Sequence, residues 1–294
     1  MALLDMLQNV SNELGLPEVT SVIGSTNRTV RQLLALAQRT VREARTRYEW
    51  PKLMRQHTIT LQDGVDSYPF PADYDRQVFR THWNTNRKWE LIGPISPQEW
   101  GIRTNGIIVT TPRQHFRVKG WANNQFFIAP TPSASDDGQT IVFEYMSTTA
   151  IVPRTWVGAT YFASGSYCSF DGRIYSVAVG GLSGTTGPLH LSGDGADDES
   201  LAGFYLVWHF ESNYSGRYQA DTDYCLIDED VIGLGIQYRW LKEKGLDWQE
   251  RAAEFERALV REKTAETGLQ SINLARGRWP RLMGPWNIPD SGYG

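Results

Sequence analysis

The 294-residue chain is poor in cysteine and has no long hydrophobic run. Its two cysteines, Cys168 and Cys225, form no CxxC pair and lack the histidines of a zinc site, so we expect two reduced, structural thiols. The apolar runs are far too short to span a bilayer, which predicts no membrane anchor. The first residues, MALLDMLQNV, have neither the basic start nor the cleavage site of a secretory signal, so we expect synthesis in a cytoplasm.

The sequence also lacks the short motifs that accompany known chemistry. It contains no HExxH, GxSxG, GxGxxG or Walker A motif, and the glycine-rich run 180–184 opens no helix that would bind phosphate. We therefore predict no catalytic residue, no metal ligand and no cofactor. The histidines are scattered, without metal-binding spacing, at His57, His82, His115, His190 and His209.

The basic residues are not concentrated in one domain, as they would be in a generic nucleic-acid-binding protein. The net charge is −4, and segment 155–212 contains Arg173 as its only Lys or Arg. The carboxylates of this segment do not have the spacing of an EF-hand, which favours a solvated acidic loop over a calcium site. They are Asp194, Asp197, Asp198 and Glu199.

Hydrophobic residues recur with a helical period at both ends of the sequence. One helix is predicted from Leu3 to Leu14 and a second from about residue 29 to 49. Another begins at Asp228 and ends at Gly245, and the last follows a capping box formed by residues 247 and 250. Because each helix has an apolar face that needs cover, we expect segments 1–55 and 213–275 to form one bundle. The expected apolar faces are Val30, Leu33, Leu34, Ala37, Val41, Ala44 and Tyr48 in the second helix, and Val231, Leu234, Tyr238 and Leu241 in the third.

Between the helices the period changes to two. The runs HTITL, QVFRTHW, GIIVTT, HFRVKGW, QFFIAP and QTIVFEYM predict an antiparallel β-domain over residues 56–154. Segment 155–212 has far fewer basic residues than either neighbour, and Asp171-Gly172 predicts a hairpin, so we expect an inserted small β-module. The predicted fold class is thus α+β. The aromatic residues of the module favour a small core over a sugar-stacking platform: Trp156, Tyr161, Tyr167, Tyr175, Tyr205 and Trp208.

Five arginines gather on one side of the second helix. At about 100° per residue they fall within roughly a third of the circumference, and most have no acidic residue four positions later. A solvated face, a contact with acidic groups of another subunit and a contact with DNA phosphates all fit this pattern. The residues are Arg28, Arg31, Arg39, Arg42 and Arg45.

The last segment, RGRWPRLMGPWNIPDSGYG (276–294), combines helix-breaking residues with large apolar ones. Glycine and proline prevent regular structure, while tryptophan is enriched among residues that dominate interface energetics. We therefore expect an extended tail that becomes ordered when it docks on a partner. The expected docking residues are Trp279, Leu282, Trp286, Ile288 and Tyr293, and the arginines that steer them are Arg276, Arg278 and Arg281.

Several long stretches resemble the head-to-tail adaptor proteins of short-tailed, double-stranded DNA bacteriophages. They are TRYEWPKL, HTITLQDGVDSYPFPADYDR, FRVKGWANNQFFIAPTPSASDDGQTIVFEYMS and YRWLKEKGLDWQERAAEFERAL. The resemblance implies a dodecameric ring in the virion neck, assembled in the host cytoplasm and bound between the portal protein and the tail nozzle. DNA would pass through the ring without sequence recognition, and the extended tail would lie along the portal.

Two other functions stay open on the sequence alone. A peptidoglycan hydrolase would need a pair of carboxylates in a cleft, and the sequence nominates no such pair. A carbohydrate-binding tail protein would act through the inserted module.

Overall fold

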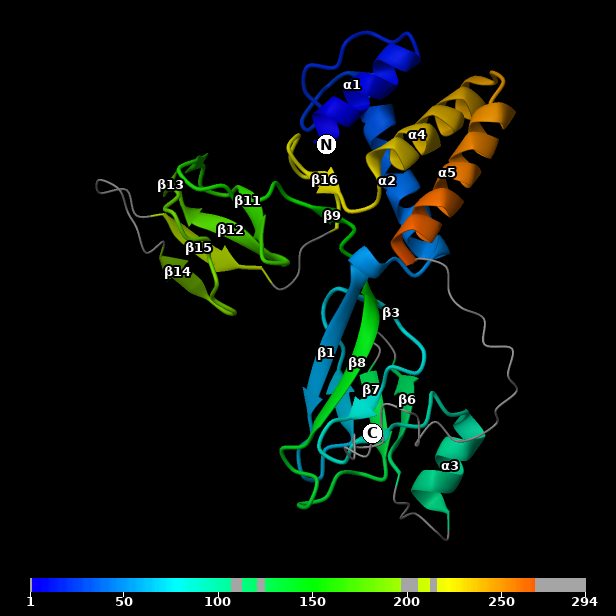
Figure 1. Ribbon diagram of the computed structural model, residues 1–294, viewed down its shortest axis with the longest axis vertical. Helices are drawn as coiled ribbons and strands as arrows, with labels where there is room; N and C mark the ends of the chain where they lie inside the picture. The colour runs from blue at the N-terminus through cyan, green and yellow to red at the C-terminus, as the bar shows by residue number, and fades with distance from the viewer. Residues whose placement is uncertain (1, 107–112, 121–124, 197–205, 212–215, 268–294) are drawn as a thin grey trace, which may run out of the picture.

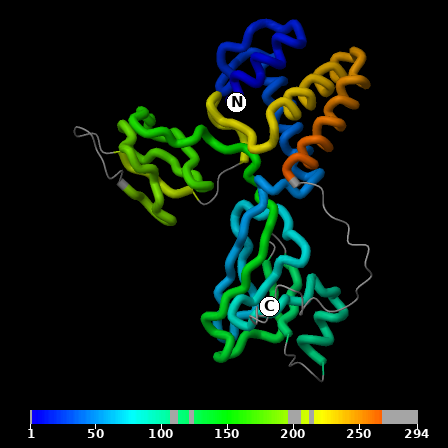
Figure 2. The backbone as a smooth tube through the Cα atoms, viewed as in Figure 1, coloured from blue at the N-terminus to red at the C-terminus, as the bar shows by residue number. Residues whose placement is uncertain are grey.

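The computed structural model describes residues 2–106, 113–120, 125–196, 206–211 and 216–267. It contains both helices and antiparallel sheets, which confirms the mixed α+β class. The elements gather in three groups, with the helices of the N-terminal and C-terminal segments above, a β-domain and one further helix below, and a small β-module to one side (Figures 1 and 2). Each group has a hydrophobic core of its own.

The helical part contains α1 (Leu3–Glu13), α2 (Arg28–Arg47), α4 (Glu229–Lys244) and α5 (Gln249–Thr267). All four contribute to one core, although α1 and α2 are far from α4 and α5 in the sequence. The side chain of Asn27 caps α2 by accepting a hydrogen bond from Thr29 N, and Gly245 ends α4 in the left-handed conformation that glycine favours. The helices therefore begin and end near the residues that the sequence predicts.

The central position of α4 corrects the prediction for its buried face. The helix contacts α1, α2 and α5 (Figure 1). Of the predicted face, Val231 is buried, but Leu234, Tyr238 and Leu241 are only partly buried, while Ile232 and Ile236 are fully enclosed. A helix covered by three others has no single apolar stripe, so its hydrophobic pattern does not define its orientation.

A buried arginine ties three of the helices together. Arg239 of α4 donates to Thr40 Oγ1 of α2 at 2.7 Å and to the carbonyl of Gly235 at 2.9 Å, and it forms an ion pair with Glu43. Glu43 also binds Arg47, which in turn pairs with Glu256 of α5. We call this set the α2–α4–α5 ion-pair network.

The β-domain is built on a long pair of antiparallel strands, β1 (Met54–Thr60) and β8 (Thr140–Ser147), which are paired along the whole of β1. β1 follows α2 through the short 3₁₀ helix η1 (Pro51–Leu53). A second sheet packs against the first around an aromatic core. The remaining strands of the domain are β2 (Ser67–Pro69), β3 (Tyr74–Gln77), β4 (Trp83–Asn84), β5 (Trp89–Glu90), β6 (His115–Lys119) and β7 (Gln125–Ala129).

Two predictions for this domain need correction. The run QVFRTHW is not one strand, because β3 ends at Gln77 and Arg80 has a φ of 63°, which breaks the extended chain before β4. The helix α3 (Pro97–Asn105) was not expected, although Ser96, Pro97 and Glu99 form a capping box with proline in the first turn. Most of the predicted strand GIIVTT lies outside the described residues.

The small module leaves the main body through a paired stem. β9 (Ile151–Val152) runs antiparallel to β16 (Tyr224–Cys225), and all module strands lie between them in the sequence. The predicted hairpin is present, with Asp171 and Gly172 both at positive φ between β11 and β12. The module strands are β10 (Tyr161–Phe162), β11 (Tyr167–Phe170), β12 (Arg173–Val179), β13 (Gly181–Leu182), β14 (Asp194–Ala196) and β15 (Val207–Phe210).

Two glycines of α4 provide a matched test of the helix packing. A Cβ atom at Gly235 would overlap Thr40 and lie 2.9 Å from Cε2 of Phe255, whereas at Gly233 the nearest atom is Val10 Cγ2 at 3.6 Å. We expect Gly235→Ala to lower the free energy of unfolding by about 1–3 kcal/mol through overpacking. Gly233→Ala should raise it by up to about 1 kcal/mol, because alanine favours the helix. Denaturant titration checks both values, and equal effects would contradict this packing.

His82 predicts an acid-sensitive β-domain. Its ring stacks on those of Phe116 and Phe143, with distances between ring centroids of 4.0 Å and 5.0 Å. Burial lowers its pKa from 6.5 to about 4. Between these two pH values the His82 ring is therefore neutral in the folded protein and protonated in the unfolded chain. Stability should fall as the pH drops from about 6.5 towards 4, by up to about 1.4 kcal/mol per pH unit.

Denaturant titrations across this pH range test the assignment. His82→Phe should flatten the pH dependence, whereas His209→Gln, which removes a histidine that is 47% exposed, should leave it in place. An unchanged slope in His82→Phe would assign the acid sensitivity to other groups.

Candidate functional site

Four of the predicted arginines form an exposed row on α2. Arg28, Arg31, Arg39 and Arg42 are all solvent-exposed, and none of them takes part in an ion pair among the described residues. Thr40, which bonds Arg239 of α4, precedes Arg42 by two positions. Thr40 belongs to the buried face of α2, and two residues correspond to about 200° on a helix, so the row lies on the solvent side of α2. We call these four residues the arginine stripe.

Arg45 does not belong to the stripe. Its side chain is only 18% exposed, its Nη1 donates to the carbonyl of Thr148 at 2.7 Å, and its Nη2 lies 3.6 Å from Asp75. It therefore links α2 to β3 and to the segment after β8. Helical spacing groups Arg45 with the stripe, but only the tertiary fold brings these partners to it.

One further arginine extends the positive surface. Arg217 is exposed and lines a shallow surface hollow together with Arg42 and Arg45. It comes from the segment that leads into β16, far from α2 in the sequence. Sequence reasoning missed it because no local pattern connects it with the helix.

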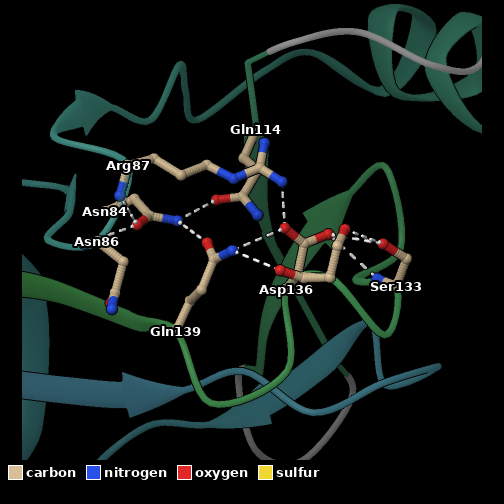
Figure 3. A network of polar contacts seen from close by, with 8 residues as sticks. Asn84, Asn86, Arg87, Gln114, Ser133, Asp136 and Gln139 are labelled. Atoms are coloured by element: carbon tan, nitrogen blue, oxygen red, sulfur yellow. Dashed lines mark hydrogen bonds and ion pairs between the residues drawn. The ribbon is translucent and has the colours of Figure 1, made fainter.

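The most extensive polar cluster of the β-domain is internally satisfied. At the end of the domain that lies away from the helices, Asn84 Nδ2 donates to Gln114 Oε1 at 2.9 Å and to Gln139 Oε1 at 3.0 Å (Figure 3). Asp136 pairs with Arg87 and accepts hydrogen bonds from Ser133. These bonds fix the segment before β8 onto β4, so the cluster explains local structure and needs no ligand.

A buried carboxylate, Asp73, is satisfied in the same way. It accepts hydrogen bonds from Tyr145 Oη at 2.8 Å and Ser147 Oγ at 2.6 Å, and it lies 3.2 Å from Arg55. Burial and the neighbouring Asp73 raise the pKa of Tyr145. The carboxylate thus holds the segment before β3 against β8, and no second carboxylate among its described contacts completes an acid–base pair.

The two cysteines match their prediction. Cys168 and Cys225 are free and buried, and burial raises the pKa of each to about 12.

The acidic segment was expected to be a solvated loop, and one of its residues differs. Asp194 lies in β14, and its Oδ1 is 2.6 Å from His209 Nδ1, so this residue is not part of a loop. The other three carboxylates of that segment lie outside the described residues. Within the described part of the chain, no group of three or more His, Cys, Asp or Glu side chains is arranged to hold a metal ion.

The aromatic residues of the module divide into core and surface. Tyr175 and Trp208 are fully buried, and Trp156 packs against them at the edge of the core, which fits the core interpretation. Tyr161 is 65% exposed, and the ring of Phe162 beside it is covered by Arg154 at 4.1 Å. Tyr205 lies outside the described residues.

All the predicted tail-docking residues, from Arg276 to Tyr293, lie outside the described part of the chain. Among the helices that the structure does describe, none combines the length and apolar character needed to cross a membrane.

Comparison with known proteins identifies the family. No curated protein matches the chain. The model of the SU10 adaptor protein family matches residues 1–164, which is more than half of the chain and covers α1, α2, the whole β-domain and the start of the module. The match supports the resemblance to phage adaptors over this range, and the chain belongs to the SU10 adaptor protein family.

Proposed function

We propose that the protein is a structural virion component, a head-to-tail adaptor of a short-tailed bacteriophage. In this proposal, copies of the chain form a ring that binds beneath the portal protein, carries the tail nozzle and surrounds the DNA exit channel. The family match supports the adaptor role. Its assembly in the host cytoplasm follows from the same role.

The arginine stripe is the observation on which this proposal depends. These exposed guanidinium groups form no ion pair within the described part of the chain, and their like charges repel one another. An acidic surface on a neighbouring subunit or the phosphates of DNA would each offset that repulsion. The stripe therefore supports a protein that works as part of an assembly.

The tail provides the second contact of the proposal. Residues 276–294 would lie along the portal with Trp279 and Trp286 as anchors. The two anchors are seven positions apart, so an extended chain would place them about 20–25 Å from each other. That distance suits two separate pockets, and the prolines would lower the entropy lost on docking.

Charge reversal on α2 tests the role of the stripe. We expect Arg31→Glu combined with Arg42→Glu to weaken assembly and to leave the melting temperature of the monomer nearly unchanged, because both side chains are exposed. Arg45→Ala should instead lower the free energy of unfolding by about 1–3 kcal/mol, because the partly buried carbonyl of Thr148 loses its charged donor and Asp75 loses one of its two arginine partners. Thermal unfolding and sedimentation velocity measure the two effects. A large loss of monomer stability in the double variant would mean that the stripe acts within its own chain.

Truncation after Ala275 tests the tail. The shortened protein should keep its melting temperature and lose stable binding to portal rings, as measured by co-sedimentation and electron microscopy. Trp279→Ala and Trp286→Ala should each cost about 2 kcal/mol or more of binding free energy if they are anchors. Asn287→Ala serves as the matched control in the same segment. Undiminished portal binding by the truncated chain would exclude the docking role.

A further inference from the structure

The helical part carries a groove between α1 and α4, near the start of α5. Its walls are apolar where Met6, Val10 and Leu234 line it. Its floor is open at Gly233, because this residue has no side chain to project from α4. We call this feature the α1–α4 groove.

The groove is predominantly acidic. Three carboxylates line it: Glu13 from α1, and Glu229 and Asp230 from the first turn of α4. The only basic residue among the lining side chains, Arg251, lies 2.8 Å from Glu254, so its charge is already compensated. Glu13 accepts a hydrogen bond from the neutral amide of Gln237, which leaves its charge in place. Glu13 and Asp230 therefore give the groove a negative charge that a basic surface can approach.

The groove and the arginine stripe are separate surfaces of the helical part. In α4, Gly235 and Arg239 face α2, whereas the groove residues Gly233 and Gln237 precede them by two positions each. Two positions turn a helix by about 200°, so the groove lies on a side of α4 that does not face α2. The stripe lies opposite the buried face of α2 and shares no residue with the groove. One subunit thus exposes a positive surface and, separately, a negative groove.

The shapes of the two surfaces also agree. The stripe is the convex face of a 20-residue helix, and its centre is occupied by the small exposed side chain of Ala35. A groove between two helices accepts such a ridge, and small residues let the two backbones come close. Guanidinium groups can then bind the carboxylates of the groove in bidentate pairs.

We propose that the arginine stripe of one subunit docks into the α1–α4 groove of a second copy of this chain. The contact is heterologous, because different surfaces of the two copies meet, and repeated contacts of this kind form a ring where the rotation between neighbours closes. This inference rests on the proposed function and deepens it, since it assigns the stripe to the neighbouring subunit and not to DNA.

A charge-swap experiment on the full chain tests this contact. The stripe variant carries Arg31→Glu and Arg42→Glu, and the groove variant carries Glu13→Lys and Asp230→Lys. Each alone brings like charges together, so we expect association about tenfold weaker or more. In an equimolar mixture every contact can again join opposite charges, and rings should return. Sedimentation velocity and electron microscopy measure the assemblies.

The controls separate this contact from general charge effects. The control variant carries Arg257→Glu and Arg261→Glu at exposed positions of α5. It changes the net charge by the same amount as the stripe variant and should leave assembly unchanged. The melting temperature of each variant shows whether it is folded. If the wild-type protein forms rings and the mixture of variants does not, the proposed contact is wrong, but the proposed ring-forming function still stands. If the stripe variant assembles like the wild type, the contact is also wrong. If the wild-type protein forms no ring either alone or on the portal, the proposed function itself fails.

Discussion

The packing of the helical part depends on one buried guanidinium group. Arg239 is 5% exposed and reaches from α4 to Thr40 and Glu43 of α2, while its plane lies near the rings of Tyr238 and Phe255. A buried charge is tolerated only where its partners are in place, so the registers of α2, α4 and α5 are fixed together. Gly235 completes this arrangement, because only a residue without a side chain leaves room for Arg239 and Thr40. The two faces that carry the stripe and the groove inherit their positions from this contact.

The β-domain is connected to the helices by short covalent and polar links. Trp50 is buried at the end of α2, and its Nε1 donates to the carbonyl of Ala44. Arg76 of β3 reaches the carbonyl of Tyr48 at 2.7 Å, and Arg45 reaches that of Thr148. These contacts lie at the junction of β1 and β8 with the helices, so the long strand pair extends the helical part in a defined direction (Figure 1).

Local patterns predicted much of the fold, and long-range contacts account for what they missed. Caps and hydrophobic period placed α1, α2, α4 and α5, and alternation placed β1, β7 and β8. Reasoning from the residues missed α3 despite its capping box, because the strands around it made a continuous β-domain the simpler interpretation. The arginine stripe was visible as a helical pattern, but the role of Arg45 and the addition of Arg217 depend on contacts between segments that are distant in the sequence. No local signal announces such partners.

The stem formed by β9 and β16 has a consequence for how this chain can change. Ile151 and Cys225 belong to the core of the helical part, whereas the core of the module is formed by other residues, such as Tyr175 and Trp208. The two ends of the module therefore return to one anchored point. Its main core is separate from that of the helices, while Val152 of the stem and Ile174 of the module share a small cluster. Substitutions within such a module can be tolerated in the way that a variable loop is tolerated on a rigid scaffold. The stem thus divides the chain into a body packed around the helical core and a module packed mainly around its own.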